Sequence, residues 1–221
     1  IFERGIWPQI SYIFQHAMLQ ELLYNSILAT KRQEYHLAIG ISMESLYSDH
    51  LEEHASMLAL HFTRGGDSDR GYRYHHLAGD RAAASYANRE ALAHFREAWR
   101  LLDERDKSQE VREKRLTTAV KMAAVMEPLG EFTATLKLLE EVLSEAREQE
   151  NPSGYARVHY WMGNTYGNLG RYEEARSHLL QALELAQKSG DKETEGDAHN
   201  YLGQLESVQG SLKRALDHGE A

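Results

Sequence analysis

The fold is decided by one stretch of the chain, Trp161–Ala175, which reads W-M-G-N-T-Y-G-N-L-G-R-Y-E-E-A. A degenerate copy follows at Tyr201–Ala215, which reads Y-L-G-Q-L-E-S-V-Q-G-S-L-K-R-A. Three pairs of small residues share an offset of 40 positions: Gly163 and Gly203, Gly170 and Gly210, Ala175 and Ala215. Self-similarity at a fixed period of this kind is the signature of a repeat protein. The chain is therefore predicted to stack similar units.

A third unit precedes these two. Gly130 lies 40 positions before Gly170, and the small residue Ala123 stands where Gly163 would be. Thr135 replaces the alanine that Ala175 supplies in the following unit. The repeated region is therefore predicted to cover residues 108–221, with its last unit incomplete.

Each unit predicts an antiparallel pair of helices. A small residue midway along the first helix lets the second helix approach closely. A glycine with positive φ ends the first helix, and an aromatic residue or leucine two positions later begins the return. One pair cannot bury both of its apolar stripes, so the pairs must stack. The expected fold is all-α, a right-handed superhelical solenoid with a concave inner face.

This pattern resembles the tetratricopeptide repeat, in a version longer than its usual length of about 34 residues. The residues that carry the resemblance are Gly163, Tyr166, Gly170, Tyr172 and Ala175. The resemblance implies a surface that holds other proteins or peptides and has no catalytic residues.

The chain before the repeats is less regular. Helical spacing at Leu51–Phe62 ends at Gly65 and Gly66, and further helices are expected at Asp69–Ala87 and Glu90–Asp103. Residues 49–107 are therefore predicted to form irregular tetratricopeptide-like hairpins, and residues 17–48 to form linking helices. Residues 1–16 are expected to form a short β-hairpin that turns around Trp7 and Pro8.

The segments Tyr12–Leu28 and Lys31–Ile39 resemble the region that joins the winged-helix part of bacterial STAND signalling ATPases, which are AAA-type, to their helical repeats. Such proteins often also carry an adenylate or guanylate cyclase, a kinase or a DNA-binding module. The resemblance implies that the β-hairpin closes a winged-helix domain and that the chain is a piece of a longer protein. No P-loop of the form G-x-x-x-x-G-K-[ST] occurs in these residues, so no nucleotide-binding residue is assigned.

Composition excludes several classes of function. A formal net charge of -9 argues against a partner that presents a row of phosphates, so nucleic acid is not expected. There is no cysteine, which fits a reducing cytoplasm and rules out disulfides and thiolate metal sites. No apolar run approaches the roughly 20 residues that span a bilayer, so no membrane partner is expected either.

One short motif suggests metal chemistry. His50, Glu53 and His54 match the H-x-x-E-H signature of inverted zinc proteases, with both imidazoles expected on one helix. Such a site also needs a third ligand and a substrate cleft, so a zinc hydrolase is kept only as an alternative. No serine lies in a Gly-x-Ser-x-Gly elbow, and His75 and His76 should point to different sides of their helix. The chain is predicted to have no catalytic residues, no metal and no cofactor.

Polar residues are predicted to line the concave groove. They follow one face of three successive first helices: Lys121, Arg157, Tyr160, Asn164, Asn168, Asn200 and Gln204. Amide side chains can bond to the backbone of an extended peptide or to a partner helix. The leading hypothesis is a scaffold or sensor module of a larger signalling protein, and a peptide-pheromone type of receptor is the first alternative. The identity of the partner, the effector domain and the oligomeric state stay open.

Overall fold

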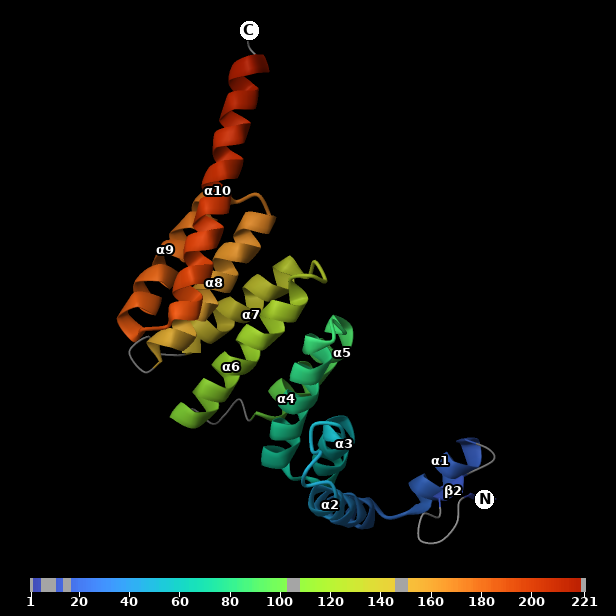
Figure 1. Cartoon of the computed structure of the whole chain (residues 1–221). Helices are drawn as coiled ribbons and strands as arrows, with labels where there is room; N and C mark the ends of the chain where they lie inside the picture. The colour runs from blue at the N-terminus through green and yellow to red at the C-terminus, as the bar shows by residue number, and fades with distance from the viewer. Residues whose placement is uncertain (1, 5–10, 14–16, 103–107, 146–150, 220–221) are drawn as a thin grey trace. The chain divides into compact units, whose positions relative to one another are not determined.

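The computed structural model describes residues 2–4, 11–13, 17–102, 108–145 and 151–219. This part of the chain is mostly helical (Figure 1). Its elements are β1 (Phe2–Arg4), β2 (Ser11–Ile13), α1 (Ala17–Ser26), α2 (Ala29–Leu46), α3 (Ala55–Gly65), α4 (Ser68–Ala84), α5 (Asn88–Leu101), α6 (Gln109–Met126), α7 (Phe132–Glu145), α8 (Pro152–Asn168), α9 (Tyr172–Ser189) and α10 (Lys192–Gly219). None of the described helices combines the length and the apolar character needed to cross a bilayer.

The chain divides into two compact units, an N-terminal unit (Ile1–Tyr74) and a C-terminal unit (His75–Ala221), and the boundary falls within α4. The C-terminal unit contains the repeated region. There α6 pairs with α7 and α8 pairs with α9, and α10 packs against both α8 and α9 (Figure 1). Helices α6 and α8 are also neighbours, so the first helices of successive pairs lie side by side.

The glycine turns between paired helices are confirmed. Gly130 and Gly170 have φ of 72° and 73°, and the next helices begin two residues later, at Phe132 and Tyr172. The amide of Arg171 donates to the carbonyl oxygen of Tyr166 at 2.9 Å, across six residues, as in a Schellman motif. This geometry closes the end of α8 and reverses the chain.

The small residues at the helix crossings are also where the pattern places them. Gly163 lies within α8, and a Cβ atom there would stand 2.6 Å from Cγ of Leu179 on α9. Ala123 on α6 and Ala175 on α9 are fully buried. Thr135, in place of the alanine, is fully buried as well, because its hydroxyl donates to the carbonyl oxygen of Glu131 at 3.0 Å.

The prediction that the chain turns at Gly210, as it does at Gly130 and Gly170, is wrong. Helix α10 continues through this residue from Lys192 to Gly219, and Gly210 has no positive φ. The turns at Gly130 and Gly170 are each followed by a full helix whose apolar stripe packs back on the first. At Gly210 the helix instead continues and keeps its backbone hydrogen bonds.

Two apolar clusters form the core of the C-terminal unit. The larger one joins α6, α7, α8, α9 and α10 through buried side chains that include Leu139, Val158, Leu179 and Leu205. The second joins α4, α5 and α6 and includes Phe95, Val125 and Met126. The repeats therefore share a continuous hydrophobic interior, as stacked helix pairs require.

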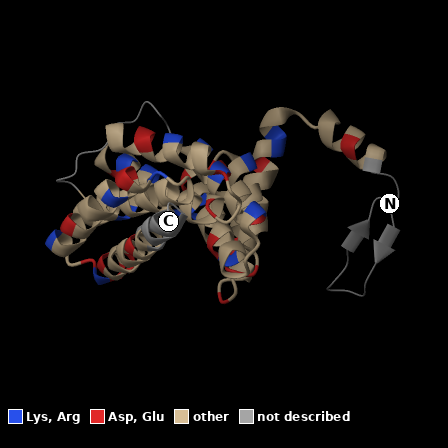
Figure 2. Cartoon of the chain, turned by 90° about the horizontal axis from the view of Figure 1, so that it is seen from above, with Lys and Arg blue, Asp and Glu red and all other residues tan. Residues whose placement is uncertain are grey.

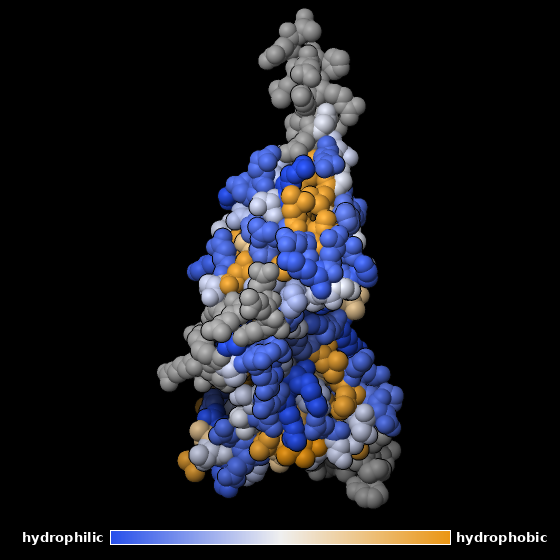
Figure 3. Space-filling view, turned by 90° about the vertical axis from the view of Figure 1, so that its left-hand side faces the viewer, coloured by the Kyte–Doolittle hydropathy of each residue, from blue (hydrophilic) through white to orange (hydrophobic). Residues whose placement is uncertain are grey.

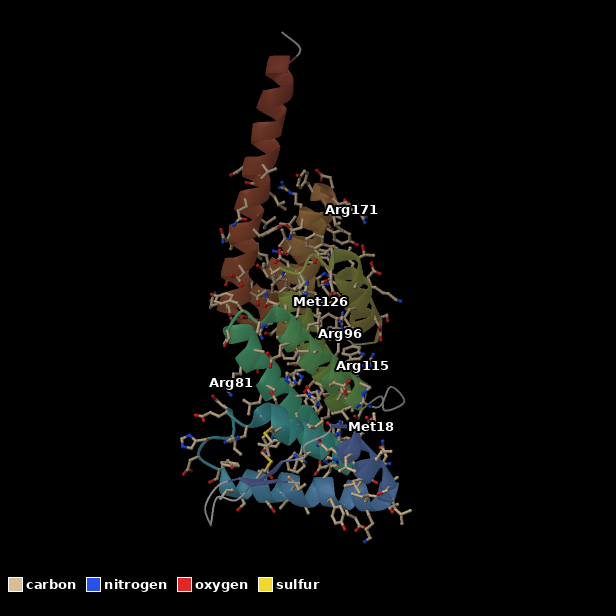
Figure 4. All side chains as sticks on the ribbon, turned by 90° about the vertical axis from the view of Figure 1, so that its right-hand side faces the viewer. Met18, Arg81, Arg96, Arg115, Met126 and Arg171 are labelled. Carbon is tan, nitrogen blue, oxygen red and sulfur yellow. The ribbon has the colours of Figure 1, made fainter. Side chains whose placement is uncertain are left out.

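Arginines tie α5 to the pair that follows it (Figure 4). Arg115 on α6 is only 3% exposed, stacks 4.1 Å over the ring of Trp99 and pairs with Glu141 on α7 at 2.7 Å. Arg96 on α5 pairs with Glu131 at 2.8 Å. The guanidinium of Arg115 is thus held by both a π-face and a carboxylate, which offsets the cost of burying it.

The N-terminal unit is built differently. Strands β1 and β2 pair antiparallel, with Glu3 opposite Tyr12, while the connection between them lies outside the described residues. The winged-helix assignment of this pair stays a prediction. The core of the unit lies where the ring of Phe62 on α3 stacks on Tyr74 with centroids 5.5 Å apart.

Helix boundaries before the repeats differ from the expected ones by a few residues. Helix α3 begins only at Ala55 and ends at Gly65, and the next residue, Gly66, has a φ of 78°. Helix α4 stops at Ala84, and Tyr86, with a φ of 59°, lies in the turn before α5. The expected helices Asp69–Ala87 and Glu90–Asp103 are therefore observed as Ser68–Ala84 and Asn88–Leu101.

Candidate binding surface

The candidate surface is the row of first helices α6, α8 and α10 in the C-terminal unit. The apolar side of each of these helices packs against other helices of the unit. The polar side of each is therefore available to form the surface. The face displayed in Figure 3 is largely hydrophilic, with hydrophobic side chains in separate patches. Acidic and basic residues are interspersed over the helices of the chain (Figure 2).

The amides predicted on α8 form a short ladder. The side-chain nitrogen of Asn168 donates to Oδ1 of Asn164 and to Oε1 of Glu127, both at 3.0 Å. Asn164 is only 9% exposed, and its backbone carbonyl accepts a hydrogen bond from the Tyr201 hydroxyl at 3.2 Å. Asn168 therefore connects α8 to the end of α6 through its side-chain amide, and Asn164 connects α8 to α10 through its backbone carbonyl.

The two predicted cations lie together at one end of the surface. Lys121 on α6 and Arg157 on α8 line a cavity of about 140 Å³ together with Thr117 and Asn151. Lys121 pairs with Asp80, and Nε of Arg157 lies 3.2 Å from Oδ2 of Asp191. Both positive charges are thus already matched by carboxylates.

The predicted amides on α10 lie at a separate place. Asn200 and Gln204 line an open cleft of about 560 Å³ with His199, Gly203 and Ser207. Nε2 of Gln204 donates to Oδ1 of Asn200 at 3.4 Å. The structure therefore does not gather all seven predicted residues into one pocket, but distributes them over three neighbouring places.

Tyr160 occupies the middle of the surface. Its ring lies edge-on to Trp161 with centroids 5.2 Å apart. Burial raises the pKa of the Tyr160 hydroxyl, and the charge of Asp197 and the proximity of Tyr201 and Glu127 raise it further, while a hydrogen bond with Asn164 acts the other way. Tyr160 therefore lies within electrostatic reach of acidic groups from both neighbouring helices.

Two residues of this central group, Glu127 and Tyr201, were missed by the sequence reasoning as candidate binding residues. Asp197 lies 40 positions after Arg157, and the repeat pattern places it on the same polar stripe. Tyr201 was read only as a repeat marker. Glu127 follows the last residue of α6, where helical periodicity no longer indicates which way a side chain points.

The His50–His54 motif, kept only as an alternative zinc site, does not have the helical geometry that such a site needs. His50 and Glu53 lie in consecutive turns before α3, and His54 is the residue that precedes its first turn. The amide of His54 bonds to the carbonyl of Leu51, so tight turns replace the helix that would align the imidazoles. The ring of His54 lies 3.8 Å from that of Tyr47 and borders a largely apolar hollow.

Within the described ranges, no group of three or more His, Cys, Asp or Glu side chains is arranged to hold a metal ion. The prediction for His75 and His76 is confirmed, because the two rings have different partners. His75 lies 3.0 Å from His94 through their Nδ1 atoms, whereas Nε2 of His76 lies 2.8 Å from the hydroxyl of Thr118.

A hydrogen-bonded chain of aromatic side chains is found in the N-terminal unit. The Tyr24 hydroxyl lies 2.8 Å from Nε2 of His36, and Nδ1 of His36 lies 3.0 Å from Nδ1 of His61. All three residues border a hollow of about 390 Å³ that Arg64 also lines. Burial lowers the pKa of both histidines, and the charge of Arg64 lowers it further.

Comparison with known proteins supports the interpretation of the repeated region. Residues 154–221 match the family model described as tetratricopeptide repeat. A search of curated proteins gave no match to the chain. The matched residues comprise α8, α9 and α10, in which Gly163, Gly170 and Ala175 have the packing and turn roles described above. This part of the chain is a tetratricopeptide-repeat region.

Proposed function

We propose that the chain is a non-catalytic binding module that holds a protein or peptide on the surface formed by α6, α8 and α10. The observation that carries the proposal is the alignment of the first helices, which brings polar side chains from three elements onto one continuous surface. Tetratricopeptide repeats generally mediate protein interactions, and the match at residues 154–221 is consistent with that role.

The finer features of the proposal follow from the resemblances in the sequence. The stacked pairs form a right-handed superhelical solenoid, with residues 108–221 as the repeats and 49–107 as irregular hairpins. Residues 17–48 link these to the end of a winged-helix domain at residues 1–16. The module belongs to a larger bacterial STAND-type signalling ATPase, works in the cytoplasm and biases a switch by binding its partner.

A displayed library of random peptides tests the binding surface. We expect peptides that bind the intact chain to lose affinity when Asn200→Arg and Gln204→Arg place bulk and charge on α10. Ser177→Arg, an equivalent change at an exposed position of α9, serves as the matched control and should leave binding intact. Binding that survives the α10 changes but is lost with the α9 change would place the binding surface elsewhere.

The absence of catalysis is tested separately. We expect the purified chain to hydrolyse no ATP and to contain no stoichiometric zinc, as measured by phosphate release and elemental analysis. Appreciable turnover by the chain itself would contradict the proposal. The peptide-receptor alternative would use the same surface, and it stays a prediction.

A further inference from the structure

Three helices line the hollow of about 390 Å³ in the N-terminal unit. It is bordered by Gln20, Glu21 and Tyr24 of α1, by His36 of α2, and by Leu60, His61 and Arg64 of α3. Leu60 is the apolar member, and the others carry hydrogen-bonding groups and charges of both signs. None of these residues belongs to the surface proposed above to bind proteins, which is part of the C-terminal unit.

Two opposite charges border the hollow without pairing. Arg64 and Glu21 are both exposed, and neither has an ion-pair partner in the part of the chain that the structure describes. The nearby cation Arg32 is engaged, because its guanidinium lies 5.1 Å from the ring centroid of Tyr24 and donates to Oδ1 of Asn25 at 3.2 Å. Arg64 and Glu21 are therefore the groups whose charges a ligand in the hollow can match.

The hydrogen-bonded chain of Tyr24, His36 and His61 runs along the same hollow. The Tyr24 hydroxyl lies 2.8 Å from Nε2 of His36, and the two Nδ1 atoms lie 3.0 Å apart. Burial lowers the pKa of both histidines below the ordinary value of 6.5, so each ring is neutral at pH 7 and carries one N–H. Only one proton can lie between the two Nδ1 atoms, so the chain has two tautomers.

The two tautomers differ in which end of the chain is a donor. If His36 donates to His61, Tyr24 donates to His36 and Nε2 of His61 carries a proton. If His61 donates to His36, Nε2 of His36 donates to Tyr24 and Nε2 of His61 becomes an acceptor. Arg64 follows His61 by three positions on α3, so the two side chains are neighbours on that helix. In the first tautomer, the hollow thus has a ring N–H beside a guanidinium.

A free α-amino acid carries the groups that match these side chains. Its carboxylate can accept two hydrogen bonds from the fork of Arg64 and another from the ring N–H of His61. Its ammonium group can pair with the Glu21 carboxylate, and Leu60 offers an apolar contact to its side chain. The volume of the hollow lies at the lower end of the range of small-ligand pockets, which is about 300–1,000 Å³.

We propose that this hollow binds a free α-amino acid, with the carboxylate on Arg64 and His61 and the ammonium group on Glu21. The bound carboxylate selects the tautomer in which Nε2 of His61 is the donor. Because Glu21 belongs to α1 and the other two residues to α3, the ligand also ties α1 to the rest of the N-terminal unit. The inference is independent of the proposed function.

Thermal unfolding of the intact chain in the presence of each common amino acid in turn tests the site. We expect at least one of them to raise the unfolding temperature as its concentration rises, because it binds only the folded chain. Titration calorimetry then gives its Kd. The carboxamide and the N-acetyl derivative of the same amino acid should each bind about tenfold more weakly, since one lacks the carboxylate and the other the ammonium group.

Variants of the two charged residues locate the ligand. Arg64→Gln and Glu21→Gln should each weaken binding by about tenfold or more, since each removes one charge partner. The matched controls are Arg89→Gln and Glu90→Gln, at exposed positions of α5, and they should leave the affinity unchanged. The carboxamide should bind equally to the unaltered chain and to Arg64→Gln, and this double-mutant cycle isolates the contact between carboxylate and guanidinium.

The contrary outcomes leave the proposed function untouched, because peptide binding is measured separately through the changes on α10. If no amino acid shifts the unfolding temperature or binds in calorimetry, the inference is overturned. It is also overturned if the affinity responds no more to Arg64→Gln than to Arg89→Gln, because the ligand then lies elsewhere. Circular dichroism shows whether each variant keeps its helices, and hydrogen exchange in α1 should slow when the ligand binds.

Discussion

At the scale of single residues, equivalent glycines in the two copies of the repeat have different surroundings. Gly163 in α8 is enclosed, because a Cβ atom there would lie 2.6 Å from Cγ of Leu179 and 3.1 Å from the carbonyl oxygen of Ala175. Gly203 lies 40 positions later in α10 and has no atom within 4 Å of such a Cβ. The sequence pattern is shared, but the close approach of a second helix is observed only at the first.

Gly163→Ala and Gly203→Ala are therefore expected to change stability in opposite directions. At Gly163 the methyl group overpacks the crossing with α9 and should lower the free energy of unfolding by roughly 1–3 kcal/mol. At Gly203 it should raise helix stability by up to about 1 kcal/mol, because alanine is a better helix former than glycine. Urea unfolding followed by circular dichroism measures both, and equal signs would contradict the packing described here.

The turn glycines make a second test at this scale. Gly170 has room for a side chain but a φ of 73°, so the cost of replacing it is conformational rather than steric. Gly170→Ala should destabilise the chain by roughly 1–2 kcal/mol. Gly170→Asn should cost less, since asparagine tolerates the left-handed region. A larger loss with asparagine than with alanine in thermal unfolding would show that space, not φ, limits this position.

At the scale of elements, histidine pairs join neighbouring helices. His75 on α4 bonds to His94 on α5, and His159 on α8 bonds to His178 on α9, through Nδ1 atoms 3.0 and 2.9 Å apart. Both pairs are separated by 19 positions. In such a bond one ring must accept through an unprotonated nitrogen, so two charged rings cannot form it.

These histidines should make the C-terminal unit sensitive to acid. Burial lowers the pKa of His75, His76 and His159 to about 4, helped by the proximity of His94, Lys121 and His178 respectively. A histidine whose folded pKa lies below its unfolded value of 6.5 binds protons preferentially when unfolded. Its contribution to stability is therefore complete above pH 6.5 and is lost as the pH falls towards 4.

Urea midpoints measured at about pH 7.5 and about pH 5 should show this loss. Helices α6 and α7 suggest a matched variant. Ala119 and Leu138 lie 40 positions before His159 and His178 and so occupy the equivalent places in the preceding pair of helices. His159→Ala combined with His178→Leu should keep the fold and reduce the dependence of the midpoint on pH. An unchanged dependence would mean that groups other than this pair dominate the acid response.

At the scale of the whole molecule, stability is expected to be local. In stacked repeats each pair of helices contacts mainly its neighbours, so a defect spreads over a short distance. Leu179 is fully buried in the larger cluster of the C-terminal unit, whereas the adjacent Leu180 is 47% exposed.

Leu179→Ala should lower the stability of the C-terminal unit by about 2–5 kcal/mol, because it leaves a cavity between α8 and α9. Hydrogen exchange should then quicken in α8 and α9, while amides of α2 and α3 in the N-terminal unit keep their protection. Leu180→Ala is the matched control and should have little effect. Uniformly faster exchange throughout the chain would show that it unfolds as one cooperative block.

The sequence by itself determined the features that depend on local chemistry. The turns at Gly130 and Gly170 were predictable, since a positive φ favours glycine and the next helix begins at a fixed distance. The burial of Ala123 and Ala175 was predictable for a similar reason, because a helix crossing accepts only small side chains. Periodic small residues thus indicated the paired helices and the tetratricopeptide-repeat character of residues 154–221.

Only the tertiary structure decided which distant groups meet. Asn168 bonds to Glu127 across 41 positions, and Tyr160 lies near Asp197, because helices from different repeats are neighbours. The side-chain amides of Asn164 and Asn168, predicted to be free for a ligand, turned out to be partly engaged. Helix α10 likewise runs on through Gly210, although the equivalent Gly170 ends its helix with a positive φ.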